Sequence, residues 1–587
     1  MKKRLPCRYK TFTTMQHHKS MFTLASHQSM ASSWLQRAPR ALVLTRACLA
    51  VAAFSVCALA TSALAQPQDP AQASTRSSGG TLPSLGDNSE LSAAAERRIG
   101  DRIAASIYRD PDYVDDPVLV DYVQSIWQPL MTAARARGEL NAELDERFAW
   151  LVFLVRDRTV NAFALPGGYF GVHLGLISTV SNRDELAAVL GHEMSHVTQR
   201  HISRLLTQQT RQAPWVIGAL ILGALAASKN PQAASAAIVG GQAAAAQSQL
   251  NFSRDMEREA DRVGFGVMLD AGFDARGVTS MFEKLQQASR LNDNGAFPYL
   301  RSHPLSTQRI GEAQARIQLM PVGAPGSSNA GSNAGSGDAA QALFVHAMMA
   351  ARARVLADPG VDVLRPMVAE ARQFASTSGS TASLLATTMT PADVRGAGAL
   401  YAGALAAAKL REFSLAQSLV AKLKSLAAGK SGNLAARQAI DLLSLEVDLL
   451  AGTVPATAAA IDLAQASGRA DLLIKARAAL AAGRARDVSD RLSTWVTVHP
   501  KDAAAWQLLA VAYGGQNQTV RAIRADAEAR AAELDYTGAL DRLRAAQAMM
   551  RGQPGSADFV EGSIIDTRAR QLDLLVKEQA LQDKVDR

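Results

Sequence analysis

The spacing of apolar residues divides the chain into segments of different character. From Leu91 the sequence LSAAAERRIGDRIAASIYRD repeats apolar residues every three or four positions, which predicts a helix. Residues 150–180 are instead rich in β-branched and aromatic side chains, and a Pro-Gly-Gly turn at 166–168 divides them, so we expect a β-hairpin. Helical periodicity resumes at Asp184. These patterns predict an α+β domain with a small β-sheet over residues 91–320.

Alanine- and leucine-rich helical patterns dominate the rest of the chain, which makes the protein mainly α overall. A Gly/Ser/Asn-rich stretch at 321–340 is expected to be a linker that leads to a helical domain at 341–587. In that domain residues 506–513 read WQLLAVAY, typical of the first helix of a tetratricopeptide repeat, and Ala522 and Ala529 fall at the small positions of the second. Such helix pairs stack into a solenoid with a concave binding surface. A generic α-helical domain is the alternative interpretation.

The amino terminus has the pattern of a secretory signal. A basic region ends at Arg46, and the apolar run after it closes on Ala-Leu-Ala at 63–65, a typical cleavage site. We expect residues 1–65 to be a signal peptide and residues 66–90, rich in Pro, Gly, Ser and Gln, to be a flexible linker. The alternative is an uncleaved membrane anchor, which the small residues at the end of the run disfavour. A cleaved leader of this type indicates export to the periplasm of a Gram-negative bacterium.

Charge and cysteine content exclude several classes of function. The formal net charge is +9, but residues 1–65 hold nine Lys and Arg and no Asp or Glu, so 62 − 9 = 53 basic residues remain against 53 acidic ones. The rest of the chain is formally neutral, and its composition offers no basis for nucleic-acid binding. All three cysteines lie in the same segment, so a mature chain would have neither a catalytic thiol nor a disulfide framework.

The sequence AAVLGHEMSHVTQRH contains the pattern H-E-x-x-H as His192, Glu193 and His196. Residues four apart share one face of a helix, so both imidazoles can bind one ion. Glu193 follows the first ligand and is placed to take a proton from a water molecule that a zinc ion acidifies. A five-residue match also occurs by chance in helices that merely carry histidines, so a third ligand is required.

A second predicted helix supplies candidates for that third ligand. The sequence NFSRDMEREADRVGF places Glu257 and Asp261 four residues apart on one face. A glutamate joining two histidines gives the His₂Glu set of catalytic zinc, and an aspartate one turn later can accept the second N–H of a ligand histidine. Glu259 is expected to point elsewhere, into solvent. The alternative for these acidic residues is an exposed helix turn with i,i+4 ion pairs.

Four blocks of the sequence together resemble the HtpX/Ste24-type zinc metallopeptidases. In the order of the chain they are VNAFALPGGYFGVHLGLI, DELAAVLGHEMSHVTQRH, SRDMEREADRVGF and RSHPLSTQRI, all within the predicted α+β domain. The resemblance implies a gluzincin-like peptidase fold, with His192, His196 and Glu257 as ligands of one zinc ion per subunit and Glu193 as the catalytic base. It also implies a catalytic part for Asp261, in some members as proton donor; we favour a role in orienting a ligand histidine.

The order of leader, peptidase and repeats further resembles the periplasmic members of this family that enhance outer-membrane β-barrel assembly. The resemblance implies quality control and assembly of outer-membrane proteins, with degradation of misfolded or stalled substrates and an additional chaperone-like activity. The repeat domain would bind unfolded outer-membrane proteins or the outer-membrane assembly machinery. One alternative is a repeat-based assembly scaffold with a latent peptidase site. Another, an integral-membrane prenyl-protein protease, is disfavoured because no apolar run of about 20 residues follows the leader.

Three further features bear on substrate access. The residues Asn161, Ala162 and Phe163 begin a strand that, by the resemblance, forms a sheet edge able to hold an extended substrate; a plain structural hairpin is the alternative. His303, in SHPLSTQRI, is a candidate oxyanion stabiliser or a fourth ligand that keeps the site latent, and a surface turn histidine is the alternative. The apolar stretch at 213–227 is short for a bilayer span and is expected to cover the active site or make a peripheral membrane contact, unless it is buried core.

Overall fold

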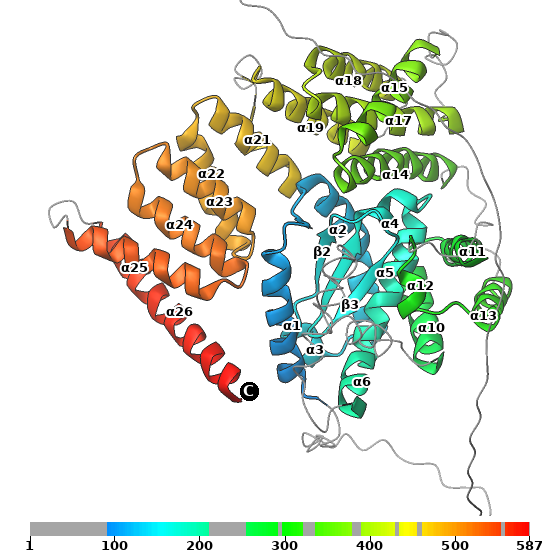
Figure 1. Ribbon diagram of the computed structural model, residues 1–587, viewed down its shortest axis with the longest axis horizontal. Coiled ribbons are helices and arrows are strands. Elements are labelled where there is room, and N and C mark those ends of the chain that lie inside the picture. The colour runs from blue at the N-terminus through cyan, green and yellow to red at the C-terminus, as the bar shows by residue number, and fades with distance from the viewer. Residues whose placement is uncertain are drawn as a thin grey trace, which may run out of the picture. The chain divides into compact units, whose positions relative to one another are not determined.

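The computed structural model describes residues 91–209, 254–290, 296–320, 335–377, 389–428, 434–454, 461–552 and 558–585 (Figure 1). The predicted signal peptide, the linker that follows it and the apolar stretch at 213–227 lie outside the described residues. Within the described ranges, no helix combines the length and the apolar character needed to cross a membrane.

The amino-terminal half combines helices with one small sheet, as the sequence patterns predict. Its elements are α1 (Ala93–Tyr108), β1 (Tyr113–Val114), α2 (Pro117–Ala136), α3 (Ala142–Arg147), β2 (Leu151–Val155), β3 (Ala162–Leu165), β4 (Tyr169–His173), α4 (Leu174–Thr179), α5 (Arg183–Thr198), α6 (His201–Gln209), α10 (Arg254–Asp270), α11 (Arg276–Arg290), α12 (Tyr299–Ser302) and α13 (Thr307–Gln318). The helix α4 lies in a segment whose residues suggested only strands. Its first four residues, Leu174–Ile177, are buried and carry no polar side chain, and so short a run has no periodicity that separates helix from strand.

The four strands form one sheet in the order β1-β2-β4-β3. β2 and β4 run parallel, whereas β1 and β3 are antiparallel to their neighbours. The predicted hairpin is β3–β4, and Gly167 and Gly168 in its turn have φ of 76° and 78°, a conformation that glycine adopts without strain. The strand order places β3 at one edge of the sheet, and Asn161 lies one residue before the strand.

Aromatic residues fill both faces of this sheet. On one face Phe153 of β2 stacks on Tyr169 of β4, and Tyr108 of α1 meets the Phe153 ring edge-on at 5.1 Å. On the other face Phe170 of β4 lies 4.6 Å from the ring of Trp127 on α2. The sheet is therefore covered by α1 on one side and by α2, which also packs against α5, on the other.

The carboxy-terminal half consists of helices that pack against their neighbours in the chain. They are α14 (Gly335–Ala357), α15 (Val361–Thr377), α17 (Pro391–Lys409), α18 (Phe413–Ala428), α19 (Leu434–Ala451), α21 (Arg469–Ala481), α22 (Ala485–Val498), α23 (Ala503–Gly514), α24 (Thr519–Ala532), α25 (Tyr536–Gly552) and α26 (Phe559–Val585). The helix α14 begins inside the segment that the sequence assigns to a linker. The WQLLAVAY motif lies on α23, and α24 packs against it with Ala525 and Ala529 buried.

Buried polar contacts join the first of these helices to the amino-terminal half. The Arg352 guanidinium of α14 is 2% exposed and makes paired hydrogen bonds to the carboxylates of Asp116 and Glu446, at 2.6–2.7 Å. On the same helix, His346 lies 2.6 Å from the Tyr122 hydroxyl of α2. Side chains of α14 to α19 belong to the same hydrophobic core as the sheet. The two halves are thus one packed unit at this junction.

Candidate metal centre

The H-E-x-x-H motif lies in α5, a helix buried over most of its length. Its amino terminus is capped by Asn182, whose side chain accepts a hydrogen bond from the Glu185 amide at 2.9 Å. Contacts with α10, α11 and β3 surround the helix, which explains why most of its residues are buried, the polar ones of the motif included. His192, Glu193 and His196 are therefore held inside the protein rather than on a solvated helix face.

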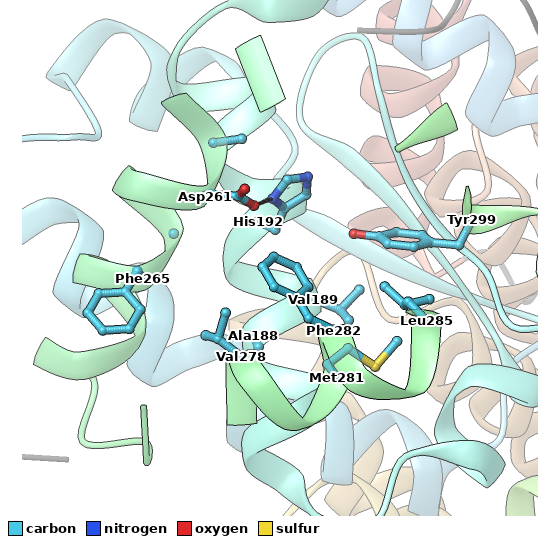
Figure 2. A pocket seen from close by; sticks show the side chains of 12 residues that line it. Ala188, Val189, His192, Asp261, Phe265, Val278, Met281, Phe282, Leu285 and Tyr299 are labelled. Carbon is cyan, nitrogen blue, oxygen red and sulfur yellow. Dashed lines mark ion pairs between the residues drawn. The ribbon is translucent and has the colours of Figure 1, made fainter. Parts of the chain in front are cut away.

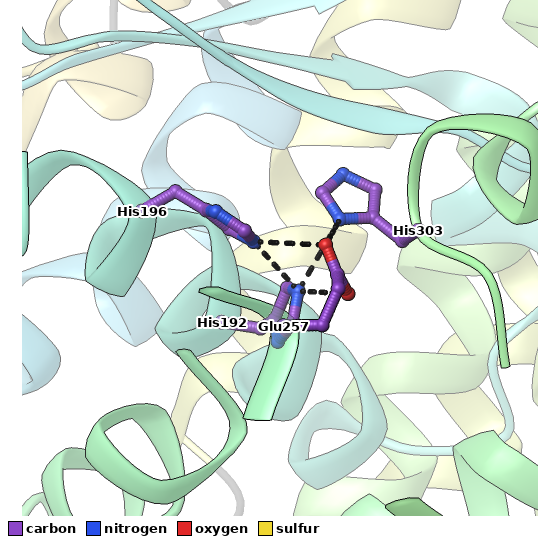
Figure 3. Close-up of side chains that lie close together, drawn as sticks. All are labelled: His192, His196, Glu257 and His303. Carbon is purple, nitrogen blue, oxygen red and sulfur yellow. Dashed lines mark hydrogen bonds and ion pairs between the residues drawn. The ribbon is translucent and has the colours of Figure 1, made fainter. Parts of the chain in front are cut away.

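A close crossing of two helices brings the third candidate ligand to the motif. Gly191 of α5 faces Gly264 of α10, where an added Cβ on Gly264 would lie 2.9 Å from the Gly191 carbonyl. Only glycine allows two backbones to approach in this way. The crossing aligns the first two turns of α10, which carry Glu257 and Asp261, with the histidines of α5, as Figure 3 shows for Glu257.

Four side chains converge in this region: His192, His196, Glu257 and His303, with all of their ligand atoms within 4.8 Å of one another. The Nε2 atoms of His192 and His196 lie 3.0 Å apart, and each is 3.5 Å from an oxygen of Glu257 (Figure 3). Tetrahedral zinc with bonds of about 2.1 Å separates its ligand atoms by about 3.4 Å. The spacing and the nitrogen and oxygen donors of this cluster therefore fit a zinc-like divalent cation.

His303 is closer to the cluster than a surface turn histidine would be. It follows α12, its ring stacks on Tyr299 with centroids 4.6 Å apart, and it is buried. Its Nδ1 lies 3.0 Å from Glu257 Oε1 and 3.3 Å from His192 Nε2. Its Nε2 lies 3.4 Å from Glu193 Oε1. The structure thus brings His303 among the candidate ligands and beside Glu193.

Glu193 is buried next to this cluster. Among the described residues, neither of its carboxylate oxygens has a hydrogen-bond partner of strict geometry, although Tyr299 is close enough to lower the pKa of Glu193 by hydrogen bonding. Burial raises the pKa of Glu193, and the neighbouring His303 and His192 offset this effect only in part. A buried acceptor with unused lone pairs is suited to a water molecule, which is what a base in this position needs.

Asp261 and Arg309 hold the far side of His192. Asp261 Oδ1 lies 3.0 Å from His192 Nδ1, and the Arg309 guanidinium donates to both Asp261 oxygens at 2.6 and 2.7 Å. Arg309 also lies 2.7 Å from Glu257 Oε2. Burial opposes ionisation of Asp261, but Arg309 and His192 hold its pKa below the ordinary value. An ionised Asp261 with both oxygens engaged is placed to orient His192, and this arrangement suits that role better than proton donation.

Charge in the cluster favours a cation at its centre. Burial opposes protonation of His192, yet its hydrogen bonds to Asp261 and Glu257 raise its pKa to about 10. Burial, reinforced by His192 and His303, lowers the pKa of His196 well below its ordinary value. Burial also opposes ionisation of Glu257, but His303 and His192 hold its pKa far below the usual range. The carboxylates therefore stabilise positive charge where a divalent ion would lie.

Glu259 is not simply solvated, contrary to the expectation from the sequence. Its Oε2 lies 3.0 Å from His201 Nε2 and 3.0 Å from Arg204 Nη2, with about a third of the side chain exposed. His201 in turn places its Nδ1 2.9 Å from His196 Nδ1. The reason is tertiary: His201 and Arg204 of α6 both reach Glu259 on α10.

A small apolar pocket lies beside His192 on the side of Asp261. It has a volume of about 30 Å³ and is bounded by α5, α10, α11 and Tyr299 (Figure 2). Apart from His192, Asp261 and Tyr299, its lining is apolar; the α11 side chains are Val278, Met281, Phe282 and Leu285. Its occupant would be a short aliphatic group rather than a charged one.

The edge strand β3 borders this region and packs against α5. Just before it, Val160 exchanges backbone hydrogen bonds with the segment that leads into α12: its amide donates to the Ala296 carbonyl at 2.8 Å, and the Tyr299 amide donates to its carbonyl at 3.4 Å. Ala162 and Phe163, two of the three residues predicted to bind substrate, lie in β3 and pair with Val172 and Gly171 of β4. The segment bearing Tyr299 and His303 thus lies along the start of the edge and covers the cluster.

Sequence patterns alone missed Arg309, Tyr299 and the Gly191–Gly264 contact. Arg309 lies in the RSHPLSTQRI block. The sequence offered one signal for it: several acidic residues were expected in one buried site, and buried carboxylates need a cationic partner. The other histidines of the described residues lie outside the cluster. His173 lies 3.0 Å from Thr159 Oγ1, His346 contacts Tyr122, and His499 packs on Trp495.

Comparison with known proteins agrees with this geometry. Residues 121–317 match the profile of peptidase family M48. The beta-barrel assembly-enhancing protease of Escherichia coli strain K12 is 33% identical over 249 residues, which cover 41% of this chain and 48% of that protein. The protein of the same name from Yersinia pestis is 33% identical over 245 residues, with the same coverage.

A mitochondrial relative matches over a shorter range. The mitochondrial metalloendopeptidase OMA1 of Arabidopsis thaliana is 32% identical over 164 residues, or 28% of this chain and 31% of that protein.

The chain spans about half the length of the bacterial relatives it matches. The family match at residues 121–317 includes the four candidate ligands, Glu193 and Arg309. The chain therefore contains a domain of peptidase family M48, extending over residues 121–317.

Proposed function

We propose that this protein is a periplasmic zinc-dependent endopeptidase that acts in the quality control and assembly of outer-membrane β-barrel proteins. The observation that carries the proposal is the convergence of His192, His196 and Glu257 beside Glu193, with ligand spacings that suit tetrahedral zinc. The names of the bacterial relatives support the cellular role, and the predicted signal peptide supports the location. One zinc ion per subunit is expected.

In the proposed reaction, the chain supplies the base and the ligand frame. A zinc ion, when bound, would polarise the scissile carbonyl and acidify the attacking water. Glu193 accepts the proton from that water through its buried carboxylate. The same carboxyl group then delivers the proton to the leaving amine. Asp261 and Arg309 keep the His192 ring in place throughout, and neither exchanges a proton with the substrate.

Substrate would bind in extended form along β3, with Asn161, Ala162 and Phe163 at the site of entry. An edge strand presents backbone groups to an added strand, which gives affinity without demanding a particular sequence. The support for this proposal is that β3 is an edge and packs against α5. A short aliphatic side chain that reaches past His192 would enter the apolar pocket, which lies on the Asp261 side of that ring.

His303 would keep the site latent until substrate or a partner displaces it. The support is its position. The distance from His303 Nδ1 to Glu257 is as short as that between two ligands of one metal ion, and the α12 segment covers the cluster. Stabilisation of the oxyanion is the second role that this position allows, once the segment has moved. If the peptidase site were always latent, the protein would be an assembly scaffold, and only the helices of the carboxy-terminal half would be active, by binding partners.

The helical half would recruit unfolded outer-membrane proteins or their assembly machinery, as tetratricopeptide-like helix pairs do for other partners. The support is the packing of successive helices, with small alanines at the α23–α24 contact. Degradation of misfolded substrates and a chaperone-like activity would then share one recruitment surface. Binding of an unfolded β-barrel protein to the full chain, with and without Glu193→Gln, separates recruitment from cleavage.

The direct test is zinc content and casein cleavage for wild type, Glu193→Gln and the control Glu146→Gln, whose carboxylate is exposed and distant from the cluster. Wild type and both variants are expected to hold one zinc ion per chain. Cleavage should fall by about 10²–10⁴-fold in Glu193→Gln and stay unchanged in the control. A wild-type protein without zinc, or a Glu193→Gln variant that cleaves as fast as wild type, would rule out the proposed reaction.

A further inference from the structure

A chain of hydrogen-bonded side chains leads from His196 away from the metal position. His196 directs Nε2 toward the cluster and Nδ1 toward His201, whose Nδ1 is 2.9 Å away. The other nitrogen of His201, Nε2, lies 3.0 Å from Glu259 Oε2, and Arg204 lies 3.0 Å from the same oxygen. His201 is fully buried. Four residues from α5, α6 and α10 thus form one continuous path.

The hydrogen atoms along this path have only one consistent arrangement. A histidine that binds a metal through Nε2 carries its proton on Nδ1, so His196 must donate to its neighbour. His201 therefore accepts at Nδ1 and carries its own proton on Nε2. That proton points to Glu259, an ionised acceptor that Arg204 also engages. Every group has the partner that its role requires.

We propose that His201 and Glu259 are positioning residues that hold the tautomer and ring orientation of His196 for metal binding. The inference rests on the proposed zinc site. Under this proposal each of the two ligand histidines is held by a chain of hydrogen bonds that ends in a carboxylate paired with an arginine. His192 is held directly by Asp261 and Arg309, whereas His196 is held through an inserted imidazole by Glu259 and Arg204.

The inserted imidazole follows from the geometry of α10. Residues two apart on a helix point to nearly opposite sides, so Glu259 cannot reach the cluster that Glu257 enters. His201 spans this gap because it stands at the start of α6, where the chain turns after the end of α5. Arg200 makes that turn with φ of 57°, an unfavourable conformation for a residue with a side chain. Its guanidinium is anchored by Glu96 at 3.1 Å and by the Leu91 carbonyl at 2.5 Å.

The test measures zinc affinity of the full chain by competition with a chromophoric chelator. His201→Phe keeps the ring volume but removes the acceptor, and zinc binding is expected to weaken by about 10- to 100-fold. Glu259→Ala should weaken it less. In the double variant, Glu259→Ala should add nothing to His201→Phe, because the path is already broken. His201→Gln should recover part of the loss, since an amide can both accept from His196 and donate to Glu259.

Controls separate positioning from folding and from failure of the site itself. The thermal unfolding of the zinc-free forms shows whether a variant is folded, and His499→Gln, a histidine in the helical half, should bind zinc as wild type does. If His201→Phe does not fold, Glu259→Ala carries the test, because its side chain is partly exposed. Zinc affinity within twofold of wild type in the folded variants overturns the inference. A wild type without zinc overturns the proposed function instead.

Discussion

Gly191 and Gly264 touch through their backbones where α5 crosses α10, and this contact sets the distance between the two halves of the candidate metal centre. A Cβ on Gly264 would lie 2.9 Å from the Gly191 carbonyl carbon and oxygen and 3.0 Å from the His192 nitrogen. Real Cβ atoms do not tolerate such distances, so the helices would have to separate. Because α5 carries His192 and α10 carries Glu257, any separation opens the cluster.

Gly264→Ala is therefore expected to impair folding and metal binding together. Overpacking at this point should cost about 1–3 kcal/mol of unfolding free energy, and zinc affinity should fall because Glu257 moves away from the histidines. Gly311→Ala on α13 is the matched control, since a Cβ there meets nothing within 4 Å and should be neutral or slightly stabilising. Urea unfolding and chelator competition measure both effects. Unchanged zinc affinity in a destabilised Gly264→Ala would show that the crossing does not control the site.

Arg309 is expected to stabilise the zinc-free protein more than the zinc-loaded one. In Arg309→Met, the buried carboxylates of Asp261 and Glu257 lose their shared cation, which should cost about 3–5 kcal/mol in the absence of metal. A bound divalent ion would restore part of the positive charge. Unfolding with and without zinc should therefore show a larger zinc effect in Arg309→Met than in wild type. An equal loss in both forms would mean that Arg309 acts through packing alone.

Replacing His303 should reveal whether it restrains the enzyme. In His303→Ala, the side chain next to Glu193 and Glu257 is gone, and casein cleavage should rise at unchanged zinc content. Leu305→Ala, in the same segment but outside the cluster, is the control for general loosening. A fall in cleavage would instead assign His303 to stabilisation of the oxyanion.

The pocket next to His192 predicts a preference among substrates. Val278 on α11 lines the pocket and is partly exposed, so Val278→Ala should widen the pocket without opening the core. Cleavage of peptides with larger aliphatic side chains next to the scissile bond should then improve by about 10-fold relative to short ones. Val278→Phe should reverse the preference. Identical cleavage profiles for the three proteins would place the pocket outside the substrate path.

Much of the architecture could be predicted because its signals are local. The helix at Leu91, the Pro-Gly-Gly hairpin and the helical carboxy-terminal half all follow from periodicity and turn residues, and all are present. The helix α4 was missed because its buried residues, Leu174–Ile177, form a run too short to show a period. The shared core of α14 with α2 and α4 was missed as well, since the ion pairs of Arg352 join residues more than ninety positions apart.

For the candidate site, the sequence by itself determined which residues share a helix face. The four-residue spacings of His192 with His196 and of Glu257 with Asp261 force each pair to one side, whatever the rest of the chain does. Only the tertiary structure decided how these faces meet. The glycine crossing directs Glu257 toward the cluster, whereas Glu259 contacts His201. Segments far along the chain supply His303 and Arg309. Such choices depend on packing between distant segments, which no local spacing encodes.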